Sequence, residues 1–369
     1  MHHPSRRALL LASAGTGALA AISGETLYVT NADGSSRYKA ALAETRRVDN
    51  MDDPRRRMVR FAIMAANSHN TQPWRFVLSE RSILVLPDLS RRLAAVDPDN
   101  HHLFVSLGCA TENIVQCAGA LGFAANPVYD ANAGGIRVGL EKAPVRLHGL
   151  FTAIPQRQST RADYDGKSLA PEDLRLLEAA GNGDGVQVRL FTEPKERDDI
   201  LAWLVAANSA QMADKAFVKE LKSWIRFSYS DALLTGDGLF SKCTDNPVLP
   251  DWLGRAIFPL VFTKDRENAK YQQQTRSSPG IAVFIGDRNE PAFWAEAGRC
   301  CQRFALQATA LDIKTAFINQ PVEVPAIRGQ FAAWLSVGER RPDLMMRFGH
   351  GPRLPQSLRR PVGQVIFDA

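Results

Sequence analysis

The sequence predicts an α+β fold in which two related α/β halves, with central antiparallel sheets flanked by helices, form a pseudo-dimer within one chain. Two β-rich runs separated by a polar turn, residues 74–78 and 82–86, have the pattern of a β-hairpin. Longer apolar runs at helical spacing surround them. The small-residue run 108–110 (Gly-Cys-Ala) recurs as 298–300 (Gly-Arg-Cys), with apolar positions following at the same offset. This internal repeat predicts the two related halves.

Composition is that of an ordinary globular protein. Of 369 residues, 45% are hydrophobic and 23% are charged, which leaves room for two modules or one large fused domain. The formal net charge is +6, but Lys and Arg are scattered and no basic stripe with interleaved aromatic residues occurs, so no nucleic-acid partner is expected. An anionic small ligand such as a phosphate fits better. The five cysteines have neither disulfide-framework nor zinc-site spacing.

Residues 1–53 are predicted to be a signal-like segment followed by an N-terminal arm. Ser5, Arg6 and Arg7 precede an Ala/Leu/Gly-rich run and together resemble a twin-arginine export signal. A frayed amphipathic start is the alternative. The run is too short and too rich in small residues for a stable membrane span. The protein is therefore expected in the periplasm or outside the cell if the signal operates, and in the cytoplasm otherwise. Residues 24–53 are polar and turn-rich, as in a surface tether.

The first half is predicted to span residues 54–149 and the second, longer half residues 150–369. An irregular insertion over 228–278, punctuated by Pro and Gly, is a candidate lid, since long irregular segments in compact domains are commonly functional. In the first half we expect a helix over 55–66, strands over 74–78 and 82–86, a helix over 100–123 and a strand over 136–140. In the second half we expect a helix over 170–180, a strand over 186–191, a helix over 200–227 and a buried strand over 280–285.

The first chemical motif lies between a helix end and a strand, at Asn67-Ser68-His69-Asn70-Thr71-Gln72-Pro73-Trp74. Short amide and hydroxyl side chains at this position could hydrogen-bond the pyrimidine edge of a flavin, which offers both acceptors and a donor. The same residue types also favour caps and turns for backbone reasons alone. The residues by themselves leave both interpretations open.

The second motif is Gln156-Arg157-Gln158-Ser159-Thr160-Arg161. Two guanidinium groups on either side of a hydroxyl can bind a terminal phosphate in a bidentate manner. A solvated arginine cluster is the alternative. The third motif is the tail, with Arg347-Phe348-Gly349 followed by Arg359-Arg360-Pro361.

These motifs resemble those of the nitroreductase superfamily. The first is similar to its Ser-x-x-Asn-x-Gln-Pro-Trp signature, with the Asn shifted by one position, and the second to its Arg-x-Ser-x-Arg motif. The resemblance implies bound FMN, with ring contacts from the first motif, phosphate contacts from the second and from a tail arginine, and backbone contacts near flavin N5 from the segment after the repeat helix. The implied FMN-binding residues are Ser68, His69, Asn70, Gln72, Arg157, Gln158, Ser159, Arg161, Ile318, Asn319, Gln320, Arg359 and Arg360.

The distribution of the motifs resembles the fused, Acg-like branch of the superfamily. The first half carries the ring motif and the second the phosphate motif, whereas residues 180–186 of the second half cannot supply a ring motif. We therefore expect one functional and one non-functional FMN site per chain, with no homo-oligomer needed. The resemblance implies an FMN-dependent oxidoreductase that passes hydride through flavin N5 to a small-molecule acceptor such as a quinone or nitroaromatic, with NAD(P)H as a candidate donor. The alternative is a protein that sequesters FMN beneath a lid.

No catalytic side chain and no metal site is expected from the sequence. His101 and His102 lie at the start of the core helix and could be metal ligands or a proton donor near a substrate. Solvated or capping histidines are the preferred interpretation, because no cysteine or carboxylate is expected at ligand spacing.

Overall fold

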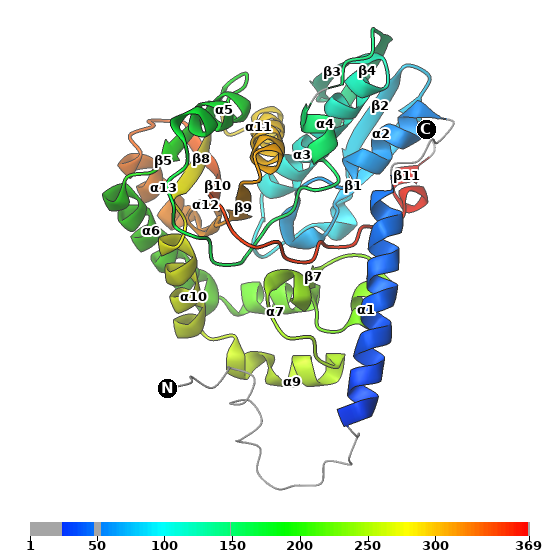
Figure 1. Cartoon of the computed structure of the whole chain (residues 1–369). Coiled ribbons are helices and arrows are strands. Elements are labelled where there is room, and N and C mark those ends of the chain that lie inside the picture. The colour runs from blue at the N-terminus through cyan, green and yellow to red at the C-terminus, as the bar shows by residue number, and fades with distance from the viewer. Residues whose placement is uncertain (1–23, 48–52, 148, 368–369) are drawn as a thin grey trace, which may run out of the picture.

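Two sheets lie on either side of a central pair of packed helices, α3 (His101–Ala120) and α11 (Pro291–Ala310) (Figure 1). The computed structural model describes residues 24–47, 53–147 and 149–367. Helix α3 packs on the first sheet and α11 on the second. This is the predicted α+β arrangement with helices flanking sheets. The signal-like segment at residues 1–23 lies outside the described residues.

The first sheet has five strands in the order β11-β1-β2-β4-β3. The predicted hairpin is present as β1 and β2, with Phe76 opposite Val85. The strand β3 was not expected, because Pro127 interrupts its sequence pattern; it lies at the edge of the sheet, where a proline does not break a hydrogen-bond ladder on both sides. The strands are β1 (Trp74–Ser79), β2 (Ser82–Pro87), β3 (Phe123–Asp130), β4 (Gly135–Lys142) and β11 (Ile366–Phe367).

One strand of this sheet comes from the far end of the chain. The strand β11 pairs in parallel with β1, with Phe76 opposite Ile366, so the tail of the second half completes the sheet of the first. The remaining pairs in the sheet are antiparallel.

The second sheet has four antiparallel strands in the order β5-β8-β10-β9. Every residue of β8 and β10 is buried, because helices and loops cover both faces of these two central strands. The tail motif Arg347-Phe348-Gly349 is thus part of a core strand. The strands are β5 (Val186–Phe191), β8 (Gly280–Gly286), β9 (Lys314–Phe317) and β10 (Arg341–Gly349).

The helices around the sheets begin where the sequence supplies caps and prolines. Asp53 accepts a hydrogen bond from the backbone N–H of Arg55 and so caps α2, and Pro54 occupies the first helical position. Helices α2 and α5 pack beside α3 and α11, respectively, and α6 packs on α12 and α13 over the second sheet. Their bounds are α2 (Pro54–Ala62), α4 (Gly149–Ala153), α5 (Pro171–Gly181), α6 (Pro194–Ala213), α12 (Gln320–Glu323) and α13 (Pro325–Trp334).

The glycines of the repeat found in the sequence lie where the two central helices contact each other. A Cβ placed on Gly108 would lie 1.8 Å from the carbonyl oxygen of Ala295, and one placed on Gly298 would lie 2.0 Å from that of Val105. The same sequence offset relates Gly108 to Gly298 and Val105 to Ala295. Each helix therefore presents its glycine to the equivalent carbonyl of the other, as at a two-fold axis between like partners. Only glycine allows this approach.

The inserted segment is more regular than the sequence pattern suggested. The prediction of an irregular stretch over 228–278 was wrong, because helices form there at 229–235, 251–261 and 264–276, and the first of them packs on α1 (Gly24–Arg46). The helix expected over 200–227 is divided at Asp214, whose carboxylate accepts from the N–H of Ala216 and starts a new helix. The elements are α7 (Lys215–Trp224), β6 (Ile225–Arg226), α8 (Tyr229–Thr235), β7 (Leu239–Phe240), α9 (Asp251–Val261) and α10 (Lys264–Arg276), with β6 and β7 paired in parallel.

The N-terminal arm is a helix, α1 (Gly24–Arg46), and not a turn-rich tether. It runs along the inserted segment at the side of the molecule (Figure 1). Tyr38 is buried against Tyr229 and Phe240, and its hydroxyl donates to the backbone carbonyl of Gln356 at 2.8 Å. The arm thus joins the inserted segment to the tail.

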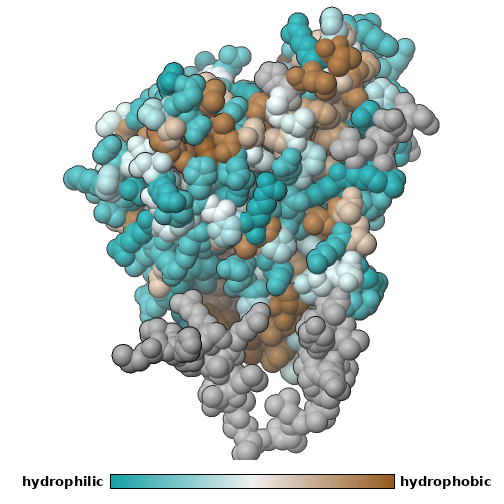
Figure 2. Space-filling view, viewed as in Figure 1, coloured by the Kyte–Doolittle hydropathy of each residue, from teal (hydrophilic) through white to brown (hydrophobic). Residues whose placement is uncertain are grey.

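The face seen in Figure 2 is mainly hydrophilic, with an apolar area at its lower edge, the region of α9. Leu260 and Val261 of α9 are exposed. Among the helices of the described residues, none combines the length and the apolar character needed to cross a membrane.

Candidate functional site

Four arginines from distant parts of the chain line one cleft, which we name the arginine cleft. They are Arg46 at the end of α1, Arg157 and Arg161 of the second motif, and Arg359 of the tail. Asn70 of the first motif lines the same cleft, whose free volume is about 70 Å³. The predicted juxtaposition of an arginine clamp from the second half with an amide-bearing loop from the first is therefore present.

Two of these arginines are held at the C-terminal end of α2. Arg157 donates from Nη2 to the carbonyl of Met64 at 3.0 Å. Arg359 donates from Nε to the carbonyl of Ile63 at 2.7 Å and from Nη2 to that of Ala65 at 3.2 Å. Carbonyls at a helix end lack partners within the helix and carry partial negative charge. They orient both guanidinium groups without neutralising them.

The arginine cleft concentrates positive charge. Within residues 24–47, 53–147 and 149–367, none of the four guanidinium groups forms an ion pair with a carboxylate. Burial, and then the neighbouring Arg46 and Arg157, hold the pKa of Arg359 well below its usual range, and burial with Arg157 lowers the pKa of Arg46 to about 10. Positive charges that are buried close together repel one another, which raises the free energy of the empty cleft. A bound anion would reduce this repulsion. The cleft is suited to a phosphate.

Two further residues of the second motif contribute to the lining of the arginine cleft. Gln158 and Ser159 both line the cleft. Gln158 donates from Nε2 to the carbonyl of Leu354 at 2.9 Å, and Ser159 forms a β-bridge with Thr315. Sequence reasoning missed Arg46, because a single arginine in a polar arm carries no signal without the fold.

The first motif is a loop of unusual backbone conformation, and it packs against the inserted segment. His69, Asn70 and Gln72 have φ values of 49°, 54° and 54°, in the left-handed region that non-glycine residues rarely adopt. Asn70 donates from Nδ2 to the carbonyls of Gly238 and Leu358, at 3.1 and 3.2 Å. Strained conformations of this kind cluster at binding sites.

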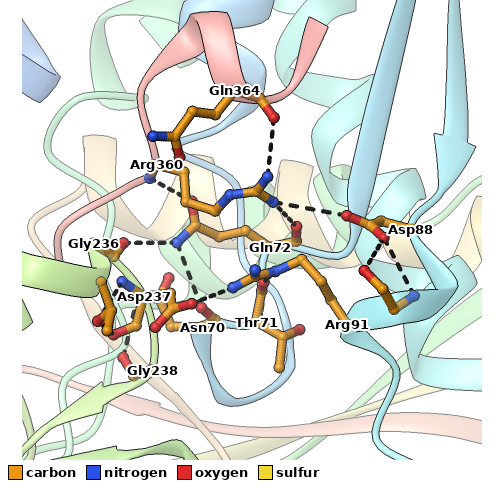
Figure 3. Close-up of polar contacts among 12 residues, drawn as sticks. Asn70, Thr71, Gln72, Asp88, Arg91, Gly236, Asp237, Gly238, Arg360 and Gln364 are labelled. Carbon is orange, nitrogen blue, oxygen red and sulfur yellow. Dashed lines mark hydrogen bonds and ion pairs between the residues drawn. The ribbon is translucent and has the colours of Figure 1, made fainter. Parts of the chain in front are cut away.

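Gln72 binds protein groups through both ends of its amide (Figure 3). Its Nε2 donates to the carbonyl of Gly236 at 2.9 Å, and its Oε1 accepts from the backbone N–H of Arg360 at 2.8 Å. Neither Gln72 nor Arg360 lines the arginine cleft. The side chain of Arg360 instead donates to the carbonyl of Gln364 at 3.0 Å and lies 3.9 Å from Asp88. Of the two tail arginines, Arg359 alone reaches the cleft.

Asp237 of the inserted segment links that segment to the same loop. Its carboxylate accepts from Arg226 at 2.7 Å. It also accepts from Arg91, which donates from Nε to the carbonyl of Thr71 (Figure 3). The side chain of Asp237 is only 9% exposed. We name this contact the Asp237 latch, because it holds the inserted segment on the loop beside the cleft.

The segment after β9 lies beside the cleft, with Phe317 among its lining residues. Ile318, Asn319 and Gln320, which the sequence placed at the flavin, do not line the cleft; Ile318 and Gln320 are buried and Asn319 is half-buried. Asn319 accepts from the backbone N–H of Met345 at 2.9 Å through Oδ1, and Gln320 Oε1 is buried. Ser68 does not line the cleft either.

His101 and His102 are not solvated, which corrects the expectation from the sequence. Both are buried, at 0% and 4% exposure, in the first turn of α3. The fold brings Asp97 and Asp343 to them, and His102 lines a second cavity, of about 290 Å³, that we name the histidine pocket. Asp97 precedes His101 by only four residues, so the sequence could have indicated that its carboxylate lies near the histidines. Asp343 is distant in the sequence, and only the fold shows that it contacts His101.

Comparison with known proteins gives distant relatives of one kind. The chain is 25% identical over 343 residues, covering 84% of this chain and 90% of the relative, to "Putative NAD(P)H nitroreductase Rv3131" of Mycobacterium tuberculosis strain H37Rv. It is 22% identical over 325 residues, covering 84% of this chain and 93% of the relative, to "Putative NAD(P)H nitroreductase acg" of the same strain. No protein-family model matches the chain. The chain is thus a distant homologue of mycobacterial proteins named as nitroreductases, in agreement with the motif resemblance.

Solved structures give weaker matches. The FMN-dependent nitroreductase NfnB of Mycobacterium smegmatis, in complex with NADPH, is 16% identical, with a TM-score of 0.39 over 58% of this chain and 96% of that chain. A nitroreductase of Bacteroides fragilis with bound FMN is 14% identical, with a TM-score of 0.37 over 58% of this chain and 95% of that chain.

Proposed function

We propose that this protein is an FMN-dependent oxidoreductase of the nitroreductase type, of the fused Acg-like branch, with one FMN bound between the two halves of the chain. The observation that carries the proposal is the arginine cleft. Four guanidinium groups without carboxylate partners among the described residues face the same space as Asn70 of the strained loop. The distant relatives, which are named as NAD(P)H nitroreductases, support the same reaction class.

The residues of the cleft fit FMN. Arg157 Nε and Asn70 Oδ1 are buried without hydrogen-bond partners within the described part of the chain, as is His69 Nδ1 of the same loop. A phosphate dianion would supply acceptors for Arg157, Arg161 and Arg359. Asn70 would then face the ring end. When bound, FMN supplies hydride transfer at N5, with NAD(P)H as candidate donor and a quinone or nitroaromatic as acceptor.

A second candidate function, FMN sequestration, is favoured by the packing of the inserted segment. The free volume of about 70 Å³ is small beside the ~300–1,000 Å³ typical of ligand pockets. Gln72 and Asn70 both bond to the segment 236–238. FMN entry therefore requires the inserted segment to move, and its return would cover the ring.

The two functions separate in one spectroscopic series. The purified protein should be yellow, and anaerobic NADPH should bleach the flavin absorbance, which menadione should then restore within seconds to minutes. A flavin that is reduced by neither NADPH nor dithionite would favour sequestration. A colourless protein that does not take up added FMN would contradict both functions.

Opening the Asp237 latch should increase flavin accessibility. In Asp237→Asn the ion pairs to Arg91 and Arg226 are lost, and breaking a buried charge pair costs about 3–5 kcal/mol. We expect faster reoxidation of reduced flavin by menadione, measured by stopped flow. Asp251→Asn, which removes an exposed pair with Arg255 on α9, is the matched control and should leave the rate unchanged. Equal rates in the two variants would exclude gating by the latch.

A further inference from the structure

We propose that Asp97, His101 and His102 form a binding site for a divalent transition-metal ion, with Zn²⁺ as the first candidate. The site is independent of the proposed flavin chemistry. One ligand atom from each of the three residues lies within 4.8 Å of the other two, and all three residues are buried. Imidazole and carboxylate are the ligand types of zinc sites that keep an open position.

Two of the three distances between ligand atoms are close to those of a tetrahedral site, and the third pair of atoms lies within 4.8 Å. The two imidazole Nδ1 atoms are 3.4 Å apart, and His102 Nδ1 is 3.7 Å from Asp97 Oδ1. Zinc–nitrogen bonds of ~2.0–2.1 Å at tetrahedral angles place neighbouring ligands roughly 3.3 Å apart. Both distances exceed the ~2.7–3.2 Å of ordinary protein hydrogen bonds. These contacts are therefore longer than most direct hydrogen bonds between protein groups.

The outer contacts orient the ligands. His101 Nε2 lies 2.8 Å from Asp343 Oδ1, so the carboxylate fixes the tautomer in which Nδ1 is free to bind a metal. A carboxylate behind a histidine is the usual support of metal-bound imidazole. Asp97 accepts the backbone N–H groups of His102 and Leu103, both at 2.9 Å, which leaves lone pairs on each oxygen.

The surrounding charges favour a dication. With neutral histidines, four carboxylates (Asp97, Asp99, Glu323 and Asp343) face two guanidinium groups (Arg328 and Arg341) around the site. The double charge of one Zn²⁺ ion would balance this excess.

The histidine pocket supplies access and an open coordination position. Asp97 and His102 line this cavity of about 290 Å³, which is large enough for water molecules. His102 Nε2 is buried and has no hydrogen-bond partner among the described residues. An ion held by three protein ligands could therefore carry water or a small anion as its fourth ligand.

The test is zinc binding by the full-length protein, as purified, after removal of metals with EDTA. We expect one zinc per chain by elemental analysis and calorimetry, and a thermal stabilisation on adding zinc. His101→Gln combined with His102→Gln should weaken zinc binding at least a hundredfold. Because His2 and His3 could bind zinc adventitiously, the matched control is His2→Gln with His3→Gln, which should retain binding.

Equal zinc binding by the two double variants would overturn the proposal, as would no binding by the wild type. If His101→Gln with His102→Gln does not fold, X-ray absorption of zinc in the wild-type protein decides. Two imidazole ligands and oxygen at ~2.0–2.2 Å are expected. Sulfur ligands or a hydrated zinc spectrum would contradict the site. None of these outcomes depends on flavin binding or turnover.

Discussion

Replacing Arg157 and Arg161 together with alanine should abolish FMN retention. Each charge-assisted phosphate contact contributes about 1.5–3 kcal/mol, so losing both should weaken FMN binding by about a hundredfold or more. Burial and then the neighbouring Arg46 and Arg157 lower the pKa of Arg359, so removing Arg157 should also relieve part of that effect. The apoprotein should therefore remain folded while losing its yellow colour. Fluorescence titration with FMN measures the change in affinity.

The control for that experiment removes two positive charges elsewhere. Arg56→Ala with Arg175→Ala alters exposed residues of α2 and α5 and should leave FMN affinity unchanged. Circular dichroism checks that both double variants are folded. Full retention of FMN by Arg157→Ala with Arg161→Ala would show that the phosphate binds elsewhere, and would leave the arginine cleft without its proposed ligand.

Substituting alanine for Gly298 should destabilise the fold strongly, although it adds only one methyl group. The new Cβ would lie 2.0 Å from the carbonyl oxygen of Val105, which is backbone and cannot rotate away. Helices α3 and α11 would have to separate, with loss of packing on both sides. Overpacking of this kind costs about 3 kcal/mol at the upper end of its usual range. The midpoint of urea unfolding should fall accordingly.

Gly329→Ala is the matched control, since it adds the same methyl group to an exposed helix. No atom lies within 4 Å of that Cβ, and alanine has the higher helix propensity, so stability should be unchanged or slightly greater. Gly108→Ala should reproduce the loss seen with Gly298→Ala, because the two contacts are equivalent. A small effect at both central glycines would mean that the helices tolerate a wider spacing.

Elements with clean periodicity could be predicted from the sequence. The hairpin, the strands at 186–191 and 280–286 and the central helix pair all carry patterns that burial on one or both faces imposes. The inserted segment could not be predicted, because its helices are short and are stabilised by contacts with α1 and with the tail. The core strand β10 was not predicted, because the charged residues Arg341 and Arg347 interrupt its apolar pattern.

Residues of the candidate site could be predicted only where they belong to a recognisable sequence motif. Arg157, Arg161, Arg359 and Asn70 meet in the arginine cleft as their motifs implied. Arg46 joins them only because α1 packs along the inserted segment. Conversely, Gln72 and Arg360 belong to matching motifs, but their polar atoms bind other parts of the chain. A local pattern does not reveal which side of a loop faces the ligand.

The pairing of β11 with β1 determines when the protein can first hold a ligand. The arginine cleft draws on Arg46 near the start and Arg359 near the end, and β11 anchors the tail only after nearly the whole chain exists. If FMN binds in the arginine cleft as proposed, a nascent polypeptide that lacks residues 355–367 should not capture it. A truncation that deletes residues 355–369 should accordingly yield a protein without flavin.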